Sequence, residues 1–118
     1  MSRDWRLYLE DIERACEKVG RFTQGCDVET FIADERTYDA VLRNLEVIGE
    51  AAKRVPDDVR SQMPDVPWRA IAGFRDFVAH VYFALDLDIL WSAIKTEVPS
   101  LLKRVEEILK QEREAQDS

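Results

Sequence analysis

Apolar residues recur along most of the chain in alternating steps of three and four positions, a spacing that places them on one face of an α-helix. The first run predicts a helix from about Asp4 to Phe22. A stronger run predicts a helix from about Arg36 to Val55, ended by Pro56, because the residue before a proline is disfavoured in helical conformation. A third run predicts a helix that begins at Trp68 and ends between His80 and Phe83.

Shorter elements and one break complete the pattern. Asp27 can cap a short helix from Val28 to Ala33, because its carboxylate can accept hydrogen bonds from the free N–H groups of a first helical turn. Residues 57–67 are rich in Pro, Asp and Gln and predict a connector with at most a short helix. A last apolar run predicts a helix from about Asp86 to Glu114. Pro99 lies inside it and predicts a kink or a restart, because proline has no N–H and clashes with the carbonyl four residues before it.

No segment requires a strand, so the pattern predicts an all-α fold, a bundle of four or five helices. At 118 residues, of which 46% are hydrophobic and 35% charged, the chain is expected to form one globular domain over residues 1–118. Its longest stretch without Asp, Glu, Lys or Arg, residues 77–85, is too short to cross a bilayer, and no apolar run follows the charged start. These features predict a soluble, cytoplasmic protein.

Charge and cysteine content narrow the functional classes. Lys and Arg total 17 against 24 Asp and Glu, and the net charge of −7 excludes a protein that coats nucleic acid through its overall charge. Any contact with nucleic acid must therefore be local. Cys16 and Cys26 form no CxxC pair and no Cys/His spacing typical of zinc, so we expect no metal and two reduced packing residues.

The only histidine, His80, lies in the segment RDFVAHVY that runs from Arg75 to Tyr82. On a helix, Asp76 and His80 share one face, four residues apart. A carboxylate beside an imidazole favours the charged ring and orients it, and an imidazole can both accept and donate protons near neutral pH. Arg75 adds a permanent planar cation that matches phosphate oxygens. These groups suit cleavage of RNA without a metal.

In that reaction the 2′-hydroxyl of the RNA attacks the neighbouring phosphodiester and leaves a cyclic phosphate on one fragment. A histidine can deprotonate the 2′-hydroxyl or protonate the leaving oxygen, while an arginine stabilises the charge that grows on the phosphoryl oxygens. One His80 per chain cannot comfortably do both. Two copies that meet across a twofold axis supply two sets of these groups, so a homodimer is part of the chemical hypothesis.

Structural roles compete with each of these interpretations. A lone histidine such as His80 is more often a hydrogen-bonded structural residue, and Tyr82 alone is more often part of a core. Asp86 and Asp88 suggest a cation site, but they are better explained as capping groups of the last helix. The three tryptophans could stack on bases, but each lies on an apolar stripe and is expected in the core: Trp5, Trp68 and Trp91.

One further cluster of charged residues lies near the end of the second predicted helix. It consists of Arg43, Glu46, Glu50, Lys53 and Arg54. Opposite charges at helical neighbour spacing are most simply an ion-paired, solvated surface. A binding face is the alternative.

The motif Arg75-x4-His80-x-Tyr82 resembles the RxxxxHxY signature of HEPN ribonucleases, and specifically of the HepT-like toxins of toxin–antitoxin pairs. Four other segments resemble the same family in the same order along nearly the whole chain. They are YLEDI (8–12), RNLEVIGEAAKR (43–54), PWRAIAGFRD (67–76) and YFALD (82–86).

The resemblance implies an α-helical HEPN fold, a homodimer with one composite cleft, and an endoribonuclease that is toxic when unrestrained, as in type VII HEPN/MNT toxin–antitoxin systems. It implies His80 as the acid–base group, Arg75 as the phosphate stabiliser and Asp76 as the polar residue that orients them. It implies no cofactor. The implied partner is a minimal nucleotidyltransferase antitoxin that attaches adenylyl groups to Tyr82, where added negative charge and bulk would exclude the RNA phosphate.

Two other functions remain open at this stage. A non-catalytic helical module could bind a partner nucleotidyltransferase or present it with a substrate, because a fold does not determine an activity. A purely structural dimeric bundle is the third possibility. It predicts that substitution of Arg75 or His80 changes stability alone.

Overall fold

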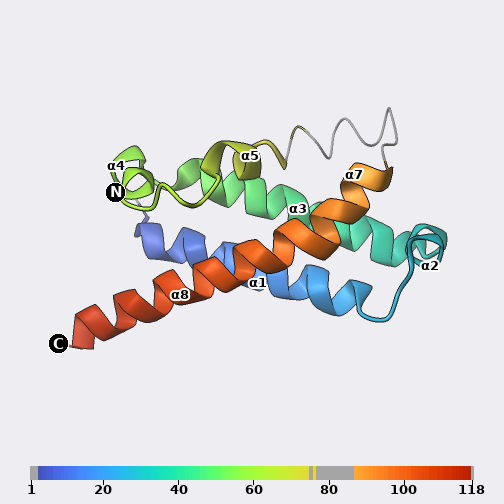
Figure 1. The fold of residues 1–118 in the computed structure, drawn as a ribbon, viewed down its shortest axis with the longest axis horizontal. Helices are drawn as coiled ribbons and strands as arrows, with labels where there is room; N and C mark the ends of the chain where they lie inside the picture. Colours follow the sequence, from blue (N-terminus) through green and yellow to red (C-terminus); the bar gives the residue numbers. More distant parts are fainter. Residues whose placement is uncertain (1–2, 75, 77–86, 118) are drawn as a thin grey trace.

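The computed structural model describes residues 3–74, 76 and 87–117, and every regular element within them is a helix (Figure 1). This confirms the predicted all-α class. The elements are α1 (Trp5–Thr23), α2 (Val28–Ala33), α3 (Glu35–Arg54), α4 (Asp57–Ser61), α5 (Trp68–Ala72), α7 (Leu87–Ser92), the π-helix η1 (Ala93–Glu97) and α8 (Val98–Asp117).

The first three helices begin where acidic residues accept hydrogen bonds from free backbone N–H groups. Asp4, Asp27 and Asp34 are the N-caps of α1, α2 and α3. The Asp27 carboxylate accepts from the backbone N–H of Thr30 at 2.8 Å, as the sequence predicts. Asp34 accepts from both the backbone N–H and the hydroxyl of Thr37, at 3.3 and 2.8 Å.

Turn residues separate these helices. Gly25 has a φ of 75°, a left-handed conformation that favours glycine, and it lies in the turn between α1 and α2. Pro56 follows α3, as predicted, and α4 is the short helix expected in the connector.

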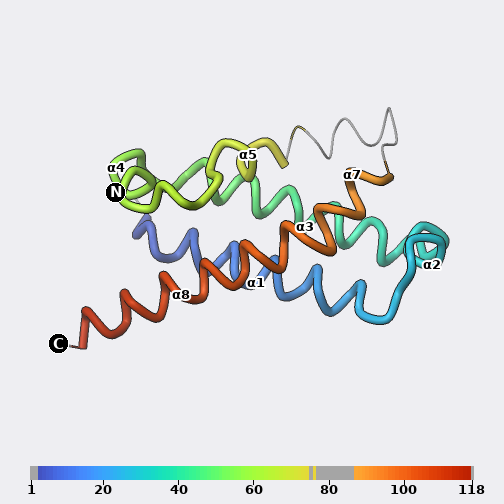
Figure 2. The backbone as a smooth tube through the Cα atoms, viewed as in Figure 1, coloured from blue at the N-terminus to red at the C-terminus, as the bar shows by residue number. Residues whose placement is uncertain are grey.

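Three helices, α1, α3 and α8, run along the long axis of the molecule, whose principal extents are 48 × 26 × 26 Å. α1 and α3 lie side by side and run in opposite directions, and α8 returns along α1 (Figures 1 and 2). An ion pair of 3.1 Å between Arg6 near the start of α1 and Glu112 near the end of α8 matches this antiparallel arrangement. α5 packs on the half of α3 that is nearer to α4 (Figure 2).

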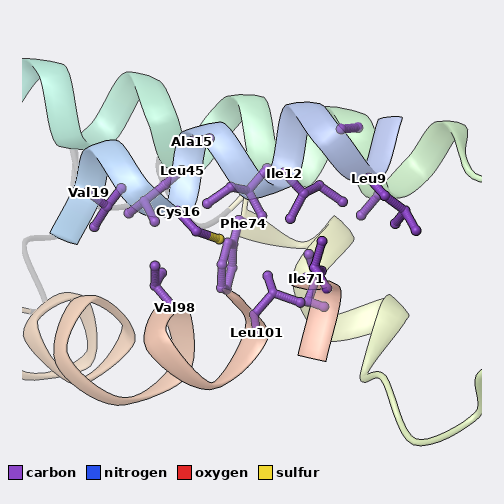
Figure 3. Packing of buried hydrophobic residues seen from close by; sticks show 14 of the residues in the cluster. Leu9, Ile12, Ala15, Cys16, Val19, Leu45, Ile71, Phe74, Val98 and Leu101 are labelled. Carbon is purple, nitrogen blue, oxygen red and sulfur yellow. The ribbon is translucent and has the colours of Figure 1, made fainter. Parts of the chain in front are cut away.

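The apolar stripes of these helices meet in one core, as the spacing predicts. Figure 3 shows side chains of α1 facing those of α3 and α8, with Phe74 between them. Trp68 is buried, and Trp5 and Trp91 pack half-buried against the same core, so the tryptophans serve the packing role expected from the sequence. The largest fully buried side chains are Phe31, Leu9, Ile12, Leu42, Leu45, Ile48, Leu90, Ile94, Val19, Val41 and Val55.

The break that Pro99 predicts is present, but it lies before the proline. Residues Ala93–Glu97 form a π-helix, in which the N–H of Val98 bonds to the carbonyl of Ala93 instead of the carbonyl of residue 94. A wider turn displaces the carbonyls that precede Pro99 from the path of its ring. The predicted single helix is therefore divided into α7, η1 and α8.

η1 also places Lys95 at the end of α1. The Lys95 ammonium donates a hydrogen bond of 3.1 Å to the carbonyl of Thr23 and lies 4.9 Å from the ring centre of Trp91. A cation is favourable there because the last carbonyls of a helix lack backbone partners and carry partial negative charge. Within the described residues, no helix is long and apolar enough to cross a membrane.

We expect Leu45→Ala to lower the free energy of unfolding by about 3 kcal/mol, because Leu45 is fully buried and its loss leaves a cavity. Leu7→Ala, at a side chain that is 39% exposed, is the matched control and should cost less than about 1 kcal/mol. Urea denaturation measures both. Equal losses would contradict the central position of Leu45.

Asp34→Ala should lower the stability of the protein at neutral pH and should make that stability less sensitive to acid. Hydrogen bonds from Thr37 hold the pKa of the Asp34 carboxyl below its ordinary value. The stabilisation is therefore fully present above about pH 4 and is lost as the pH falls through the lowered pKa. The unfolding temperatures of the wild type and the variant, measured from neutral to acid pH, should converge as the pH falls. A constant difference, or the same behaviour in the control Asp39→Ala, would contradict the cap.

Candidate active site

Of the four predicted site residues, Asp76 lies within the described part of the chain. It is helical and exposed. Arg75, His80 and Tyr82 lie outside the described residues, as do Asp86 and the predicted helix end between His80 and Phe83. Two described segments flank the motif, one on each side.

The flank before the motif is held by apolar burial. α5 starts after Pro67, and the Trp68 indole donates a hydrogen bond of 3.1 Å to the carbonyl of Met63. Ile71 and Phe74 are then buried against α1, α3 and α8 (Figure 3). At about 100° per residue, Phe74 and Asp76 point to opposite sides of a helix. The burial of Phe74 therefore accounts for the exposure of Asp76.

The flank after the motif is held in the same way. Leu90 of α7 is buried, and Trp91 packs on Phe31 with ring centres 5.3 Å apart. Asp88 lies exposed in the first turn of α7, where its negative charge offsets the helix dipole as expected from the sequence. The motif is thus bounded in the sequence by two anchored helices.

Two hollows lie on different sides of α5. One, of about 520 Å³, has Ala70, Ile71 and Phe74 on one wall and residues of η1 and α8 on the other. It is mostly apolar. Arg104 donates hydrogen bonds of 2.5 and 3.3 Å to Asp65 at its edge, and this guanidinium holds the pKa of the Asp65 carboxyl below its ordinary value.

The other hollow is a groove of about 540 Å³ between the end of α3, α4 and α5, called here the basic groove. It is lined by Lys53, Asp57, Arg60, Ser61, Pro64, Trp68, Arg69 and Ala72. Arg60 and Arg69 are not conspicuous in the sequence, because helix periodicity relates residues of one helix and the groove joins three. Lys53 alone belongs to a cluster that the sequence singles out.

The other residues of that cluster, Arg43, Glu46, Glu50 and Arg54, include one ion pair of the kind that the sequence favours. Arg43 and Glu46 lie 3.6 Å apart in an ion pair. Both line a further hollow together with Glu50 and Arg54, as well as Arg3 and Asp11, which are themselves paired at 2.6 Å. Carboxylates offset the cations in that hollow.

Neither cysteine is disulfide-bonded, in agreement with the expectation of reduced packing residues. Burial raises the pKa of the Cys16 thiol to about 12, so the thiol stays protonated and is not a nucleophile. Within residues 3–74, 76 and 87–117, no group of three or more His, Cys, Asp or Glu side chains could hold a metal ion.

Comparison with known proteins identifies the family of the chain. Residues 12–108 match the model of the family described as "Ribonuclease HepT-like". The chain is 42% identical to the "Probable ribonuclease HepT" of Thermococcus cleftensis, over 93% of this chain and 100% of that protein.

Two more relatives are named as putative RNases. One, from Caldanaerobacter subterraneus, is 42% identical over 92% of this chain and 96% of its own length. The other, from Methanocaldococcus jannaschii, is 38% identical over 92% of this chain and 90% of its own length. No solved structure matches the chain significantly. The family match runs from within α1 to within α8 and spans the Arg75–Tyr82 motif, and the chain therefore belongs to the HepT-like ribonuclease family.

Proposed function

We propose that this protein is the toxin of a type VII HEPN/MNT toxin–antitoxin system, an endoribonuclease that cleaves cytoplasmic RNA without a metal cofactor. The observation that carries the proposal is the Arg75-x4-His80-x-Tyr82 motif within a helical chain of the HepT-like family. The relatives named as ribonucleases extend over more than nine-tenths of the chain.

The proposed reaction begins when the imidazole of His80 takes the proton of the RNA 2′-hydroxyl. The 2′-oxygen then attacks the neighbouring phosphorus, the bond from phosphorus to the 5′-oxygen breaks, and that oxygen receives a proton. The products are a 2′,3′-cyclic phosphate and a free 5′-hydroxyl. Arg75 stabilises the negative charge that grows on the non-bridging phosphoryl oxygens.

The second proton transfer requires a second imidazole, so we place the site at the interface of a homodimer. The His80 of each copy would serve opposite roles in one cleft. Asp76 is the polar residue that orients the set. Its exposure on the face opposite Phe74 leaves its carboxylate open to an imidazole, whose charged form a neighbouring carboxylate favours.

The proposed regulator is a minimal nucleotidyltransferase antitoxin that transfers AMP from ATP to the hydroxyl of Tyr82. The tyrosine oxygen attacks the α-phosphorus and pyrophosphate leaves. A phosphodiester so close in sequence to Arg75 and His80 would place negative charge where the RNA phosphate must bind.

His80→Ala should lower the rate of RNA cleavage by at least about 100-fold, because it removes the group that moves protons. Products of the wild type should carry cyclic phosphate and should form in EDTA. Gel analysis of a labelled RNA measures the rate, and Lys18→Ala, an exposed cation on α1, is the control. Equal cleavage by His80→Ala, or none by an unmodified wild type, would reject the ribonuclease in favour of a binding module.

Co-expression with a minimal nucleotidyltransferase should increase the intact mass of the protein by one or more AMP groups. Tyr82→Phe should take up none, because the acceptor hydroxyl is absent. Intact-mass spectrometry measures both. Unchanged uptake in Tyr82→Phe would move the modification to another residue, with Tyr8 and Tyr38 as the remaining tyrosines of the chain.

A further inference from the structure

The basic groove concentrates positive charge on a protein that is acidic overall. The chain has a net charge of −7, whereas the groove holds three cationic side chains, Lys53, Arg60 and Arg69, and one carboxylate, Asp57. Folding brings these cations together from the last turn of α3, from α4 and from α5.

Two of the three cations have no acidic partner in the described part of the chain. Arg60 pairs with Asp57, an i,i+3 neighbour within α4. Lys53 and Arg69 are exposed and take part in none of the ion pairs or side-chain hydrogen bonds of those residues. By contrast, the arginines of the hollow around Arg43 face three carboxylates, Asp11, Glu46 and Glu50. The basic groove therefore holds two cations that no carboxylate of the described residues neutralises.

The groove also lies next to the motif. Arg69 and Ala72 line it, and Asp76 follows at the next one-turn spacing. The backbone stays helical in conformation at Gly73, which has φ −72° and ψ −9°, and Phe74 and Asp76 are helical. The groove side of α5 thus leads toward Asp76, about two helical turns beyond Arg69.

The chemistry of cleavage requires contacts of this kind. In the proposed reaction Arg75 contacts one phosphate, the one that is attacked. The RNA strand continues on both sides of that phosphate and carries one negative charge per nucleotide. Proteins that hold single strands do so with a positively charged groove along the backbone. The exposed cations Lys53 and Arg69 fit that role better than they fit a protein partner, whose surface would need apolar contacts that this groove offers only at Trp68, Pro64 and Ala72.

We infer that the basic groove is a binding site for the RNA backbone, in which Lys53, Arg60 and Arg69 contact phosphates adjacent to the one cleaved. This inference rests on the proposed ribonuclease function and adds the path of the substrate. The Lys53 and Arg69 side chains contribute most, because Arg60 shares its charge with Asp57.

The test measures RNA binding by protein that cannot cleave. In a His80→Ala background, the affinity for a fluorescent single-stranded RNA of about a dozen nucleotides is measured by anisotropy at several salt concentrations. Lys53→Gln with Arg69→Gln should weaken binding on the order of fivefold per lost contact near 0.1 M salt. The slope of log affinity against log salt should fall by about 0.7 per contact.

The matched control is Lys18→Gln with Lys110→Gln, which removes two exposed cations from α1 and α8 and changes the net charge equally. It should leave both the affinity and the slope near those of the parent. The conservative variant Arg69→Lys should retain most of the affinity, because a phosphate contact needs the charge. Circular dichroism and size-exclusion chromatography establish that every variant is folded and has the same oligomeric state.

Each result decides the inference. A weaker affinity and a smaller slope in the groove variant alone support it. Equal weakening in both double variants overturns it in favour of a general effect of net charge. An unchanged groove variant also overturns it and leaves the groove to a protein partner.

Cleavage by protein with an intact His80 tests the proposed function separately. If wild type cleaves RNA and the groove variant binds and cleaves like it, the inference fails and the ribonuclease stands. If wild type does not cleave but loses RNA binding on substitution of Lys53 and Arg69, the ribonuclease fails and the binding site stands.

Discussion

The burial of Ile71 and Phe74 between α1, α3 and α8 is the contact on which the position of the motif depends (Figure 3). These two side chains hold the end of α5 against the core and turn Asp76 outward. α5 has only five residues, too few to form a stable helix in isolation, so its place is determined by packing. The same contact separates the two sides of α5, one facing an apolar hollow and the other facing the basic groove.

Helix periodicity and capping chemistry were sufficient to predict most of the fold. α1, α2, α3 and α4 lie close to their predicted positions because each begins at a recognisable cap or proline, and α1 and α3 also carry uninterrupted apolar stripes. The last helix differs. Pro99 predicts a break, because its ring clashes with the carbonyl four residues before it. That clash does not specify how the backbone avoids it, and in the structure the backbone forms the π-helix Ala93–Glu97.

The candidate site likewise has one part that the sequence predicts and one that it does not. The motif residues Arg75, Asp76, His80 and Tyr82 could be selected from the sequence by chemistry, spacing and family resemblance, and the family is confirmed. The basic groove could not be predicted, because Lys53, Arg60 and Arg69 belong to three helices and become neighbours only through the fold. In the sequence Lys53 belongs to a cluster with Glu50 and Arg54, for which an ion-paired surface is the simpler interpretation. In the structure Lys53 instead lines the groove together with Arg69, whereas Arg43 and Glu46 line a different hollow.

The uneven distribution of charge has a kinetic consequence. A net negative charge repels a polyanion at long range, whereas a local positive groove attracts it once the molecule is suitably oriented. Encounters are thereby steered toward one orientation, and ions in solution weaken this steering because they screen charges beyond about 10 Å at 0.1 M salt. On this charge distribution we expect the protein to meet an RNA strand in one orientation and not to coat it along its length.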